Sequence, residues 1–303
     1  MTQKKRMLIT GVSGLLGNNL AYYFRNKYRI LGLYLSHPVT IKGVQTEKVD
    51  ILSQNSVRKT IKDFKPDVVI HCASLTDVDF CENNRTITRK INIEGCRFIG
   101  QALKGSRAKL VYISSDSVYD GKNGNFSEVD PIRPKNYYGL SKYKGELEIL
   151  KHPDSLVLRT NIFGWNIQNK SSIAEWILEK LKQHVPVKGF RDAEFSSVYT
   201  FKLAQIMDAA IRNDLRGVYN CASRDAISKY EFAVRLARSF KLDPAMIRPI
   251  SIDTFGFKAS RGKNLSLDTS KLRHDLHCAL PTVQSSLDAF RRDFRAGLPG
   301  KIR

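Results

Sequence analysis

Short, continuous apolar runs alternate with stretches of helical periodicity through the first half of the chain. The runs predict strands at residues 7–10, 29–35, a short segment ending near 51, 68–70, 110–113 and 156–158. Between them, apolar residues recur at helical spacing and predict helices at 15–27, 57–64, 91–103 and 136–150. Apolar strands separated by helices are typical of a parallel sheet covered on both faces. The pattern therefore predicts a doubly wound α/β fold.

Helical patterns dominate the second half of the chain. They cover residues 173–181, 203–210, 228–240 and 287–294, and single strands such as 218–220 interrupt them. We expect a smaller C-terminal α+β region after the sheet domain, with residues 1–163 in the first unit and 164–303 in the second. The boundary near Gly164 is soft, because later segments could return to the first domain.

The first predicted strand runs directly into three glycines, and a helix follows. Glycines allow a tight turn and close approach of a pyrophosphate, while the helix N-terminus supplies free N–H groups. In this context the turn predicts a Rossmann domain that binds a dinucleotide, although its spacing is GxxGxxG rather than GxGxxG. The residues expected around the phosphates are Gly11, Ser13, Gly14, Leu15, Leu16 and Gly17.

The second strand ends without the acidic residue that would accept a hydrogen bond from the free 2′-hydroxyl of NAD. Ser36 and His37 stand there instead and could hydrogen-bond a 2′-phosphate. The sequence therefore favours NADP(H) over NAD(H), although the same two residues also fit an ordinary uncharged loop. The third strand ends at Asp50 and Ile51, where we expect them to reach the adenine edge.

Tyr138 and Lys142 lie four positions apart in a predicted helix, so both project from one face. An ammonium beside a phenol favours phenolate and lowers the phenol pKa, which suits proton exchange with an alcohol or ketone. Ser115 follows the strand at 110–113, at the sheet edge where such folds carry their sites, and could bind the same oxygen. Tyr23 and Lys27 repeat the spacing, so the pair alone is weak evidence.

Composition narrows the range of functions. The chain has 303 residues, a formal charge of +21 and 42% hydrophobic residues, enough for a sizeable core. Its cationic residues are scattered, which favours a solvated surface that steers small anions over a nucleic-acid footprint. The five cysteines lack metal-ligand spacing, so we expect no metal site and the reduced thiols of a cytoplasmic protein. No stretch is long enough to span a membrane.

Several segments in the same order resemble the extended short-chain dehydrogenase/reductase superfamily, and its dTDP-4-dehydrorhamnose reductase-like branch most closely. The glycine turn, Ser115 and the Tyr138 to Lys142 pair carry the likeness to the superfamily. The segments that carry the likeness to the branch are residues 71–79, 114–121, 138–146, 158–161 and 263–272. The resemblance spans most of the chain.

The resemblance implies a role for each matching residue. Tyr138 would be the general acid/base, Lys142 would hold the nicotinamide ribose and depress the tyrosine pKa, and Ser115 would bind the substrate oxygen. Ala73 and Ser74 would lie near the adenosine ribose, and Cys72 would also contact the cofactor. The residues implied at the substrate are Ser117, Asn161 and Trp165, with Phe163 as the alternative to Trp165 for the aromatic ring that the branch carries after strand six. The Tyr23 to Lys27 copy would be structural, because that helix packs on the sheet.

The implied function is an NAD(P)H-dependent reductase of a keto sugar, with a nucleotide-activated sugar as the expected substrate. Related 4,6-dehydratases carry an Asp-Glu pair where this chain has Asp116 and Ser117, so elimination chemistry is disfavoured. Two alternatives stay open: a nucleotide-sugar epimerase, which recycles its cofactor, and a non-catalytic NADP-binding subunit resembling the regulatory subunit of methionine adenosyltransferase. A homodimer is one option for its assembly.

Overall fold

A seven-stranded parallel sheet forms the centre of the protein, with the strand order β11-β6-β5-β4-β1-β2-β3. The computed structural model describes residues 4–168 and 171–302. The strands are β1 (Arg6–Thr10), β2 (Arg29–Tyr34), β3 (Gln45–Lys48), β4 (Val68–His71), β5 (Lys109–Ser115), β6 (Ser155–Thr160) and β11 (Gly217–Asn220). The chain reverses direction across the sheet between β1 and β4, and this order confirms the predicted doubly wound α/β fold.

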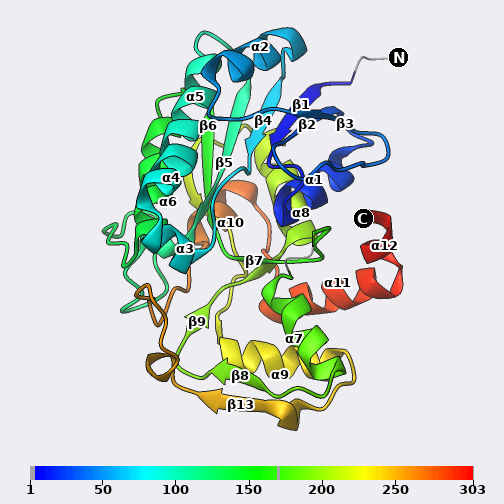
Figure 1. Cartoon of the computed structure of the whole chain (residues 1–303), viewed down its shortest axis with the longest axis vertical. Helices are drawn as coiled ribbons and strands as arrows, with labels where there is room; N and C mark the ends of the chain where they lie inside the picture. Colours follow the sequence, from blue (N-terminus) through cyan, green and yellow to red (C-terminus); the bar gives the residue numbers. More distant parts are fainter. Residues whose placement is uncertain (1–3, 169–170, 303) are drawn as a thin grey trace.

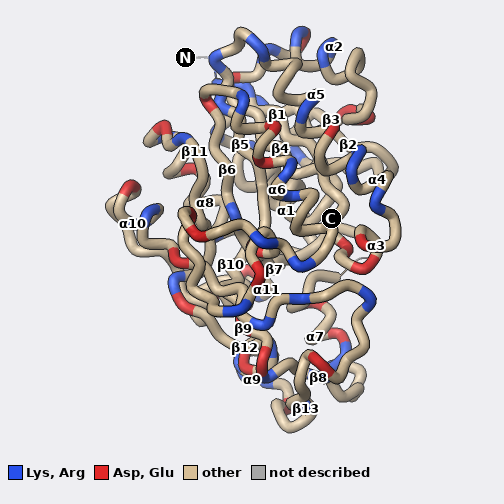
Figure 2. Tube along the Cα trace, turned by 90° about the vertical axis from the view of Figure 1, so that its left-hand side faces the viewer, with Lys and Arg blue, Asp and Glu red and all other residues tan. Residues whose placement is uncertain are grey.

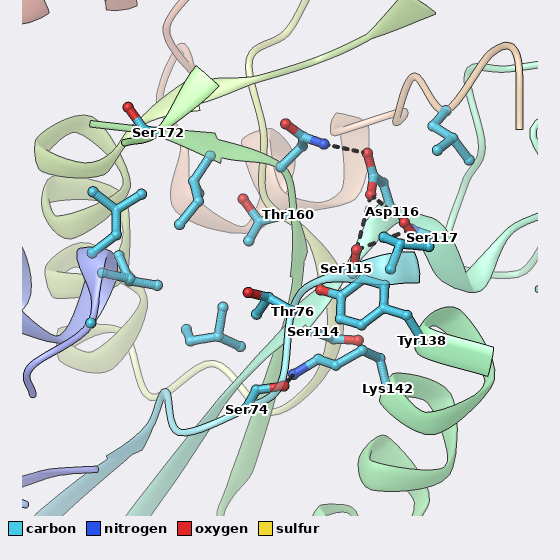
Figure 3. Close-up of a pocket in the computed structure, with 18 of the residues that line it drawn as sticks. Ser74, Thr76, Ser114, Ser115, Asp116, Ser117, Tyr138, Lys142, Thr160 and Ser172 are labelled. Atoms are coloured by element: carbon cyan, nitrogen blue, oxygen red, sulfur yellow. Dashed lines mark hydrogen bonds between the residues drawn. The ribbon is translucent and has the colours of Figure 1, made fainter. Parts of the chain in front are cut away.

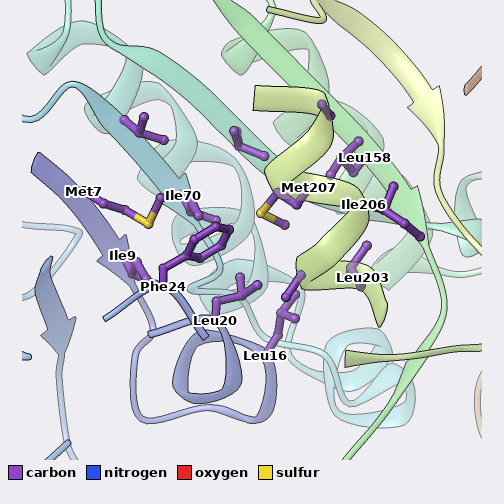
Figure 4. Close-up of a cluster of buried hydrophobic side chains, with 14 of the residues drawn as sticks. Met7, Ile9, Leu16, Leu20, Phe24, Ile70, Leu158, Leu203, Ile206 and Met207 are labelled. Carbon is purple, nitrogen blue, oxygen red and sulfur yellow. The ribbon is translucent and has the colours of Figure 1, made fainter. Parts of the chain in front are cut away.

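Both faces of the sheet are buried under helices (Figure 1). In β1, Met7 and Ile9 belong to one apolar cluster and Leu8 to another, as expected when successive side chains point to opposite faces. The helices α1 (Leu15–Phe24) and α8 (Thr200–Arg212) cover the first face, and their side chains interdigitate with β1, β4 and β6 (Figure 4). The helices α2 (Gln54–Phe64), α5 (Gly95–Ala102) and α6 (Tyr137–Ile149) cover the second.

The C-terminal region has a hydrophobic core of its own. Phe163, Phe232 and Phe290 pack edge to face at its centre, with ring centroids 5.1 and 5.5 Å from Phe163. The elements around this core are α7 (Ile173–Lys182), α9 (Lys229–Ser239), α11 (Val283–Arg295) and α12 (Leu298–Ile302), with the paired strands β8 (Val187–Phe190) and β13 (Ile247–Ile250). Two later segments, α8 and β11, return to the central sheet domain, so a single cut at residue 164 separates the two regions only approximately.

Short elements complete the fold. The two-residue strands are β7 (Ile162–Phe163), β9 (Glu194–Phe195), β10 (Val198–Tyr199) and β12 (Ile227–Ser228), and the remaining helices are α3 (Val78–Asn83), α4 (Arg85–Arg89) and α10 (Ser270–Leu276). The helix predicted at 91–103 is interrupted, because residues 90–94 form a π turn before α5 begins. The helix predicted at 15–27 ends at Phe24, whose carbonyl accepts from both Lys27 and Tyr28 and so closes the turn into β2.

Charge is spread over both regions rather than gathered in a tail. Figure 2 shows lysine and arginine positions along helices and loops of the sheet domain and of the C-terminal region. Within the described ranges, no helix combines the length and the apolar character needed to cross a bilayer.

A buried ion pair joins α6 to the sheet beneath its carboxyl edge. The guanidinium of Arg159, on β6, donates to both carboxylate oxygens of Glu146, on α6, with Nη2 2.7 Å from Oε2. The same guanidinium donates to the Tyr119 hydroxyl at 2.7 Å, and Ser114 of β5 donates to the Glu146 carboxylate. Because every partner is buried and hydrogen-bonded, this network fixes α6 against β5 and β6.

We predict that Glu146→Gln lowers the free energy of unfolding by about 3 kcal/mol or more, because the buried Arg159 charge loses its counter-ion. Asp63→Asn is the control: its partner Lys59 is 80% exposed, so the loss there should stay below about 1 kcal/mol. Urea unfolding measures both, and equal effects would contradict the account.

Candidate functional site

A cavity of about 560 Å³ opens at the carboxyl ends of the central strands. The glycine turn after β1, the ends of β5 and β6, the start of α6 and residues of the C-terminal region all line it. In a doubly wound sheet this edge, next to the reversal of strand order, is the usual place for a ligand. The site is therefore built between the two regions of the chain.

The glycine turn is closely packed. Gly11 has a φ of +68°, and a Cβ there would lie 2.8 Å from the backbone nitrogen of Ala73. A Cβ on Gly17 would lie 2.2 Å from the Gly11 carbonyl oxygen, so helix and turn touch through their backbones. Gly14 caps α1 without a side-chain hydrogen bond, which leaves the first N–H groups of the helix to an anion. These features fit the pyrophosphate of a dinucleotide.

Tyr138 and Lys142 project from α6 into the middle of the cavity, as the spacing predicted (Figure 3). The helix starts there because the Asn136 side chain accepts from the Gly139 backbone at 2.9 Å. The Tyr138 hydroxyl points toward Ser115 at the end of β5. The Lys142 ammonium lies 3.4 Å from the Ser74 hydroxyl, so α6 brings both groups to the sheet edge.

Burial governs the charges of this pair. It lowers the pKa of Lys142 to about 8, and it raises the pKa of Tyr138 above its usual value, an effect that the Ser115 hydroxyl opposes. The structure differs here from the expectation that Lys142 depresses the tyrosine pKa. The ammonium faces Ser74 and the ring of Tyr112, with 4.3 Å to the ring centroid, rather than the phenol. Tyr138 is consequently protonated at neutral pH and able to donate a proton.

One buried carboxylate organises three of the predicted residues. Asp116 accepts from the Ser115 hydroxyl at 3.0 Å, the Ser117 hydroxyl at 3.3 Å and the Asn161 amide at 2.8 Å. Burial raises the pKa of Asp116, and these hydrogen bonds with the nearby Lys229 ammonium oppose the shift. Asp116 thereby joins the end of β5 to the residue that follows β6, within the cavity.

Most of the predicted site residues line this cavity. They are Gly11, Gly14, Leu15, Leu16, Gly17, Cys72, Ser74, Ser115, Ser117, Tyr138, Lys142 and Asn161. Seven others do not line it: Ser13, Ser36, His37, Asp50, Ile51, Ala73 and Trp165. Tyr23 and Lys27 also lie outside it, where Lys27 pairs with Asp208 of α8 at 2.6 Å.

Local contacts explain the residues that lie outside the cavity. Ser36 and His37 are exposed after β2 and hydrogen-bond each other at 2.9 Å. Asp50 accepts from the backbone of Leu52 at 2.9 Å. The expectation that Trp165 contacts substrate needs correction: its ring stacks on Phe290 with centroids 3.9 Å apart, inside the C-terminal core.

Several cavity residues carry no local signal in the sequence. Lys229 opens α9, and Arg261 comes from a loop before α10, so only the tertiary fold brings them to the site. Gln168 donates to the Ser13 carbonyl at 2.6 Å and so joins the far region to the glycine turn. Lys135, in contrast, does have a local signal: it directly precedes the α6 cap residue Asn136, so it could have been predicted as a site residue together with the Tyr138 segment.

Comparison with known proteins places this geometry in a family. Residues 5–296 match the family described as RmlD substrate binding domain. The chain belongs to this family. A curated relative, methionine adenosyltransferase 2 subunit beta of Danio rerio, is 30% identical in an alignment of 282 positions that covers 89% of this chain and 85% of the relative.

Two solved structures show how far the family likeness extends in three dimensions. The dTDP-4-dehydrorhamnose reductase of Bacillus anthracis in complex with NADP has a TM-score of 0.86 and 26% identity, covering 96% of this chain and 100% of the other. A hypothetical dTDP-4-dehydrorhamnose reductase of Sulfolobus tokodaii has a TM-score of 0.82 and 33% identity, covering 91% and 97%. Family and fold thus agree with the resemblance inferred from the motifs.

We predict that Lys142→Met stabilises the ligand-free protein at pH 7, by up to about 3 kcal/mol, because the variant no longer buries an ammonium. Below a pH of about 8, Lys142 is charged in both folded and unfolded chains, so the cost of burying it is fully present. Between about 8 and its usual pKa of 10.5, only the unfolded chain stays protonated, and the wild type regains stability as the pH rises.

The advantage of the variant should therefore shrink between pH 8 and 10, as measured by urea unfolding. Lys144→Met on the exposed face of the same helix is the control and should change stability by less than about 0.5 kcal/mol. A stability difference for Lys142→Met that does not change with pH would contradict the burial of the charge.

Proposed function

We propose that the protein is an NAD(P)H-dependent reductase of a nucleotide-activated keto sugar. One observation carries the proposal: the Tyr138 phenol, Ser115 hydroxyl and Lys142 ammonium face a single cavity that the glycine turn also lines. Proton donor and dinucleotide cradle therefore meet where a carbonyl group could react. The similarity to dTDP-4-dehydrorhamnose reductases supports the same reaction.

Each group in the cavity has a definite task in this reaction. A bound nicotinamide dinucleotide supplies a hydride to the carbonyl carbon. The glycine turn would bind the pyrophosphate through backbone N–H groups, and Lys142, whose ammonium lies 3.4 Å from the Ser74 hydroxyl, would bind the nicotinamide ribose. Tyr138, protonated at neutral pH, donates its proton to the carbonyl oxygen, and Ser115 lies beside the phenol to bind that oxygen.

The substrate side fits a polar, anionic sugar derivative. Lys135 and Arg261 also line the cavity, and the chain as a whole carries a formal charge of +21. Such charge attracts a diphosphate-bearing molecule.

An epimerase would return its cofactor to the starting state, so net consumption of NADPH favours the reductase. A homodimer remains a prediction for the assembly.

We predict that Tyr138→Phe lowers the rate of NADPH-dependent reduction of dTDP-4-dehydrorhamnose by about 10²- to 10⁴-fold, because the proton donor is lost. NADPH binding should persist, since the ring and the glycine turn remain. Loss of NADPH absorbance measures the rate, and fluorescence titration measures the binding.

Tyr23→Phe is the matched control, because Tyr23 has the same spacing to a lysine but lies outside the cavity. It should keep the wild-type rate. Full activity of Tyr138→Phe, or equal losses in both variants, would exclude Tyr138 as the proton donor.

The proposed cofactor is NADP(H). The end of β2 carries no carboxylate to repel a 2′-phosphate, and Ser36 and His37 are exposed there. The Bacillus anthracis neighbour was solved with NADP. Both observations favour a site that tolerates the extra phosphate.

We expect Ser36→Asp to lower kcat/KM for NADPH by about tenfold or more through like-charge repulsion. The same substitution should leave kcat/KM for NADH unchanged or improved, because the carboxylate can accept from the free 2′-hydroxyl. Initial rates with each cofactor give the ratio. If both values change by the same factor, Ser36 is not near the 2′ position.

A second function is favoured by the relative from Danio rerio, which is named as a subunit of methionine adenosyltransferase. In that case the chain would bind NADP and a partner enzyme without turning over a sugar. Tight NADPH binding, no reduction of dTDP-4-dehydrorhamnose and co-purification with a methionine adenosyltransferase would together support it. The intact set of Ser115, Tyr138 and Lys142 favours catalysis instead.

A further inference from the structure

Two oppositely charged side chains line the cavity, and in the part of the chain that the structure describes they form no salt bridge with each other. Asp116 lies just beyond β5, and Lys229 is the first residue of α9 in the C-terminal region. The Lys229 backbone donates to the Ala193 carbonyl at 2.9 Å, and the Ser228 hydroxyl caps α9 by accepting from Glu231 at 3.0 Å. The base of the lysine side chain is therefore fixed.

The Lys229 ammonium is held by aromatic rings rather than by a carboxylate. Its Nζ lies 5.9 Å from the ring centroids of both Phe190 and Phe195, within the range of a cation–π contact. Across residues 4–168 and 171–302 it takes part in no salt bridge. Burial and Arg261 disfavour its charge, while Asp116 favours it. An ammonium in this setting gains from a ligand that accepts a hydrogen bond.

Asp116 has room for one more donor. Its Oδ1 accepts from Ser115 and Ser117, while its Oδ2 accepts from Asn161 at 2.8 Å. A carboxylate oxygen has two lone-pair sites, so Oδ2 can take a second hydrogen bond. Ser115, which lies beside the Tyr138 phenol, donates to the other oxygen of the same carboxylate, so Asp116 stands one side chain away from the place of the reacting carbonyl.

We propose that Lys229 is a specificity-determining residue, which together with Asp116 binds the sugar hydroxyl next to the reacting carbonyl. The proposal rests on the proposed reductase function. The ammonium donates to the hydroxyl oxygen, and the hydroxyl donates to Asp116 Oδ2. A hydroxyl fits because it is both donor and acceptor, whereas a phosphate here would be repelled by the Asp116 carboxylate.

Titration calorimetry with the NADP-loaded protein tests this inference. The probes are dTDP-rhamnose, its analogue without the C3 hydroxyl, and dTDP. For Lys229→Met we expect dTDP-rhamnose to bind about 10- to 100-fold more weakly, with dTDP unchanged. The analogue should bind wild type and variant with similar, weak affinity. Methionine is unbranched and apolar like the lysine stem, so the region should stay folded.

Lys188→Met, an exposed lysine on β8 in the same region, is the matched control and should change none of the affinities. Equal weakening of dTDP and dTDP-rhamnose by Lys229→Met would overturn the proposal, because Lys229 would then bind the diphosphate. Unchanged affinities, or no binding of dTDP-rhamnose to the wild type, would also overturn it. A selective loss for dTDP-rhamnose without any NADPH-dependent reduction would uphold the hydroxyl site and exclude the reductase function.

Discussion

The close approach of α6 to the central sheet is the constraint on which the site depends. A Cβ on Gly139 would lie 2.0 Å from the carbonyl oxygen of Ser117, in the turn just after β5, and one on Gly145 would lie 2.6 Å from the hydroxyl of Tyr112 in β5. Only glycine fits at these two contacts. The buried ion pair between Glu146 of α6 and Arg159 of β6 also fixes this helix against the sheet. Together they set the distance at which side chains of α6 meet the ends of the strands.

Desolvation then gives the cavity its chemistry. Burial raises the pKa values of Tyr138 and Asp116 and lowers those of Lys142 and Lys229. In each case it favours the neutral form of the side chain. Buried charges of this kind are costly, and a polar ligand that hydrogen-bonds them recovers part of that cost. A site of this kind is suited to a substrate with hydroxyl and carbonyl groups. The raised pKa of Tyr138 also keeps its phenol protonated until the carbonyl oxygen of a substrate accepts the proton.

The fold and the centre of the site follow from local sequence patterns. Apolar runs predicted β1, β2, β4, β5 and β6, three glycines marked the turn after β1, and the Tyr138 to Lys142 spacing placed both side chains on one helix face. The strand β3 is polar and lies at Gln45–Lys48, before the expected segment ending near 51, and nothing local in the sequence placed β11 at the edge of the sheet. Trp165 was misjudged because an aromatic residue after β6 fits a substrate wall and a core equally well, and only its stacking on Phe290 decides. Lys229 and Arg261 reach the cavity only through the tertiary fold, so the local sequence around Tyr138 could not predict them. The direction of the Tyr138 pKa shift depends on burial and on where the Lys142 ammonium points, and neither is visible in a spacing of four residues.

The central claim is that hydride and proton meet at one carbonyl beside Tyr138. Its most direct test is a single turnover of dTDP-4-dehydrorhamnose with NADPH deuterated at the transferring position of the nicotinamide. We predict that mass spectrometry finds one deuterium on the former carbonyl carbon of the product, with an equal amount of NADP⁺ formed. Recovery of unreduced sugar, or of reduced sugar without deuterium, would contradict the account.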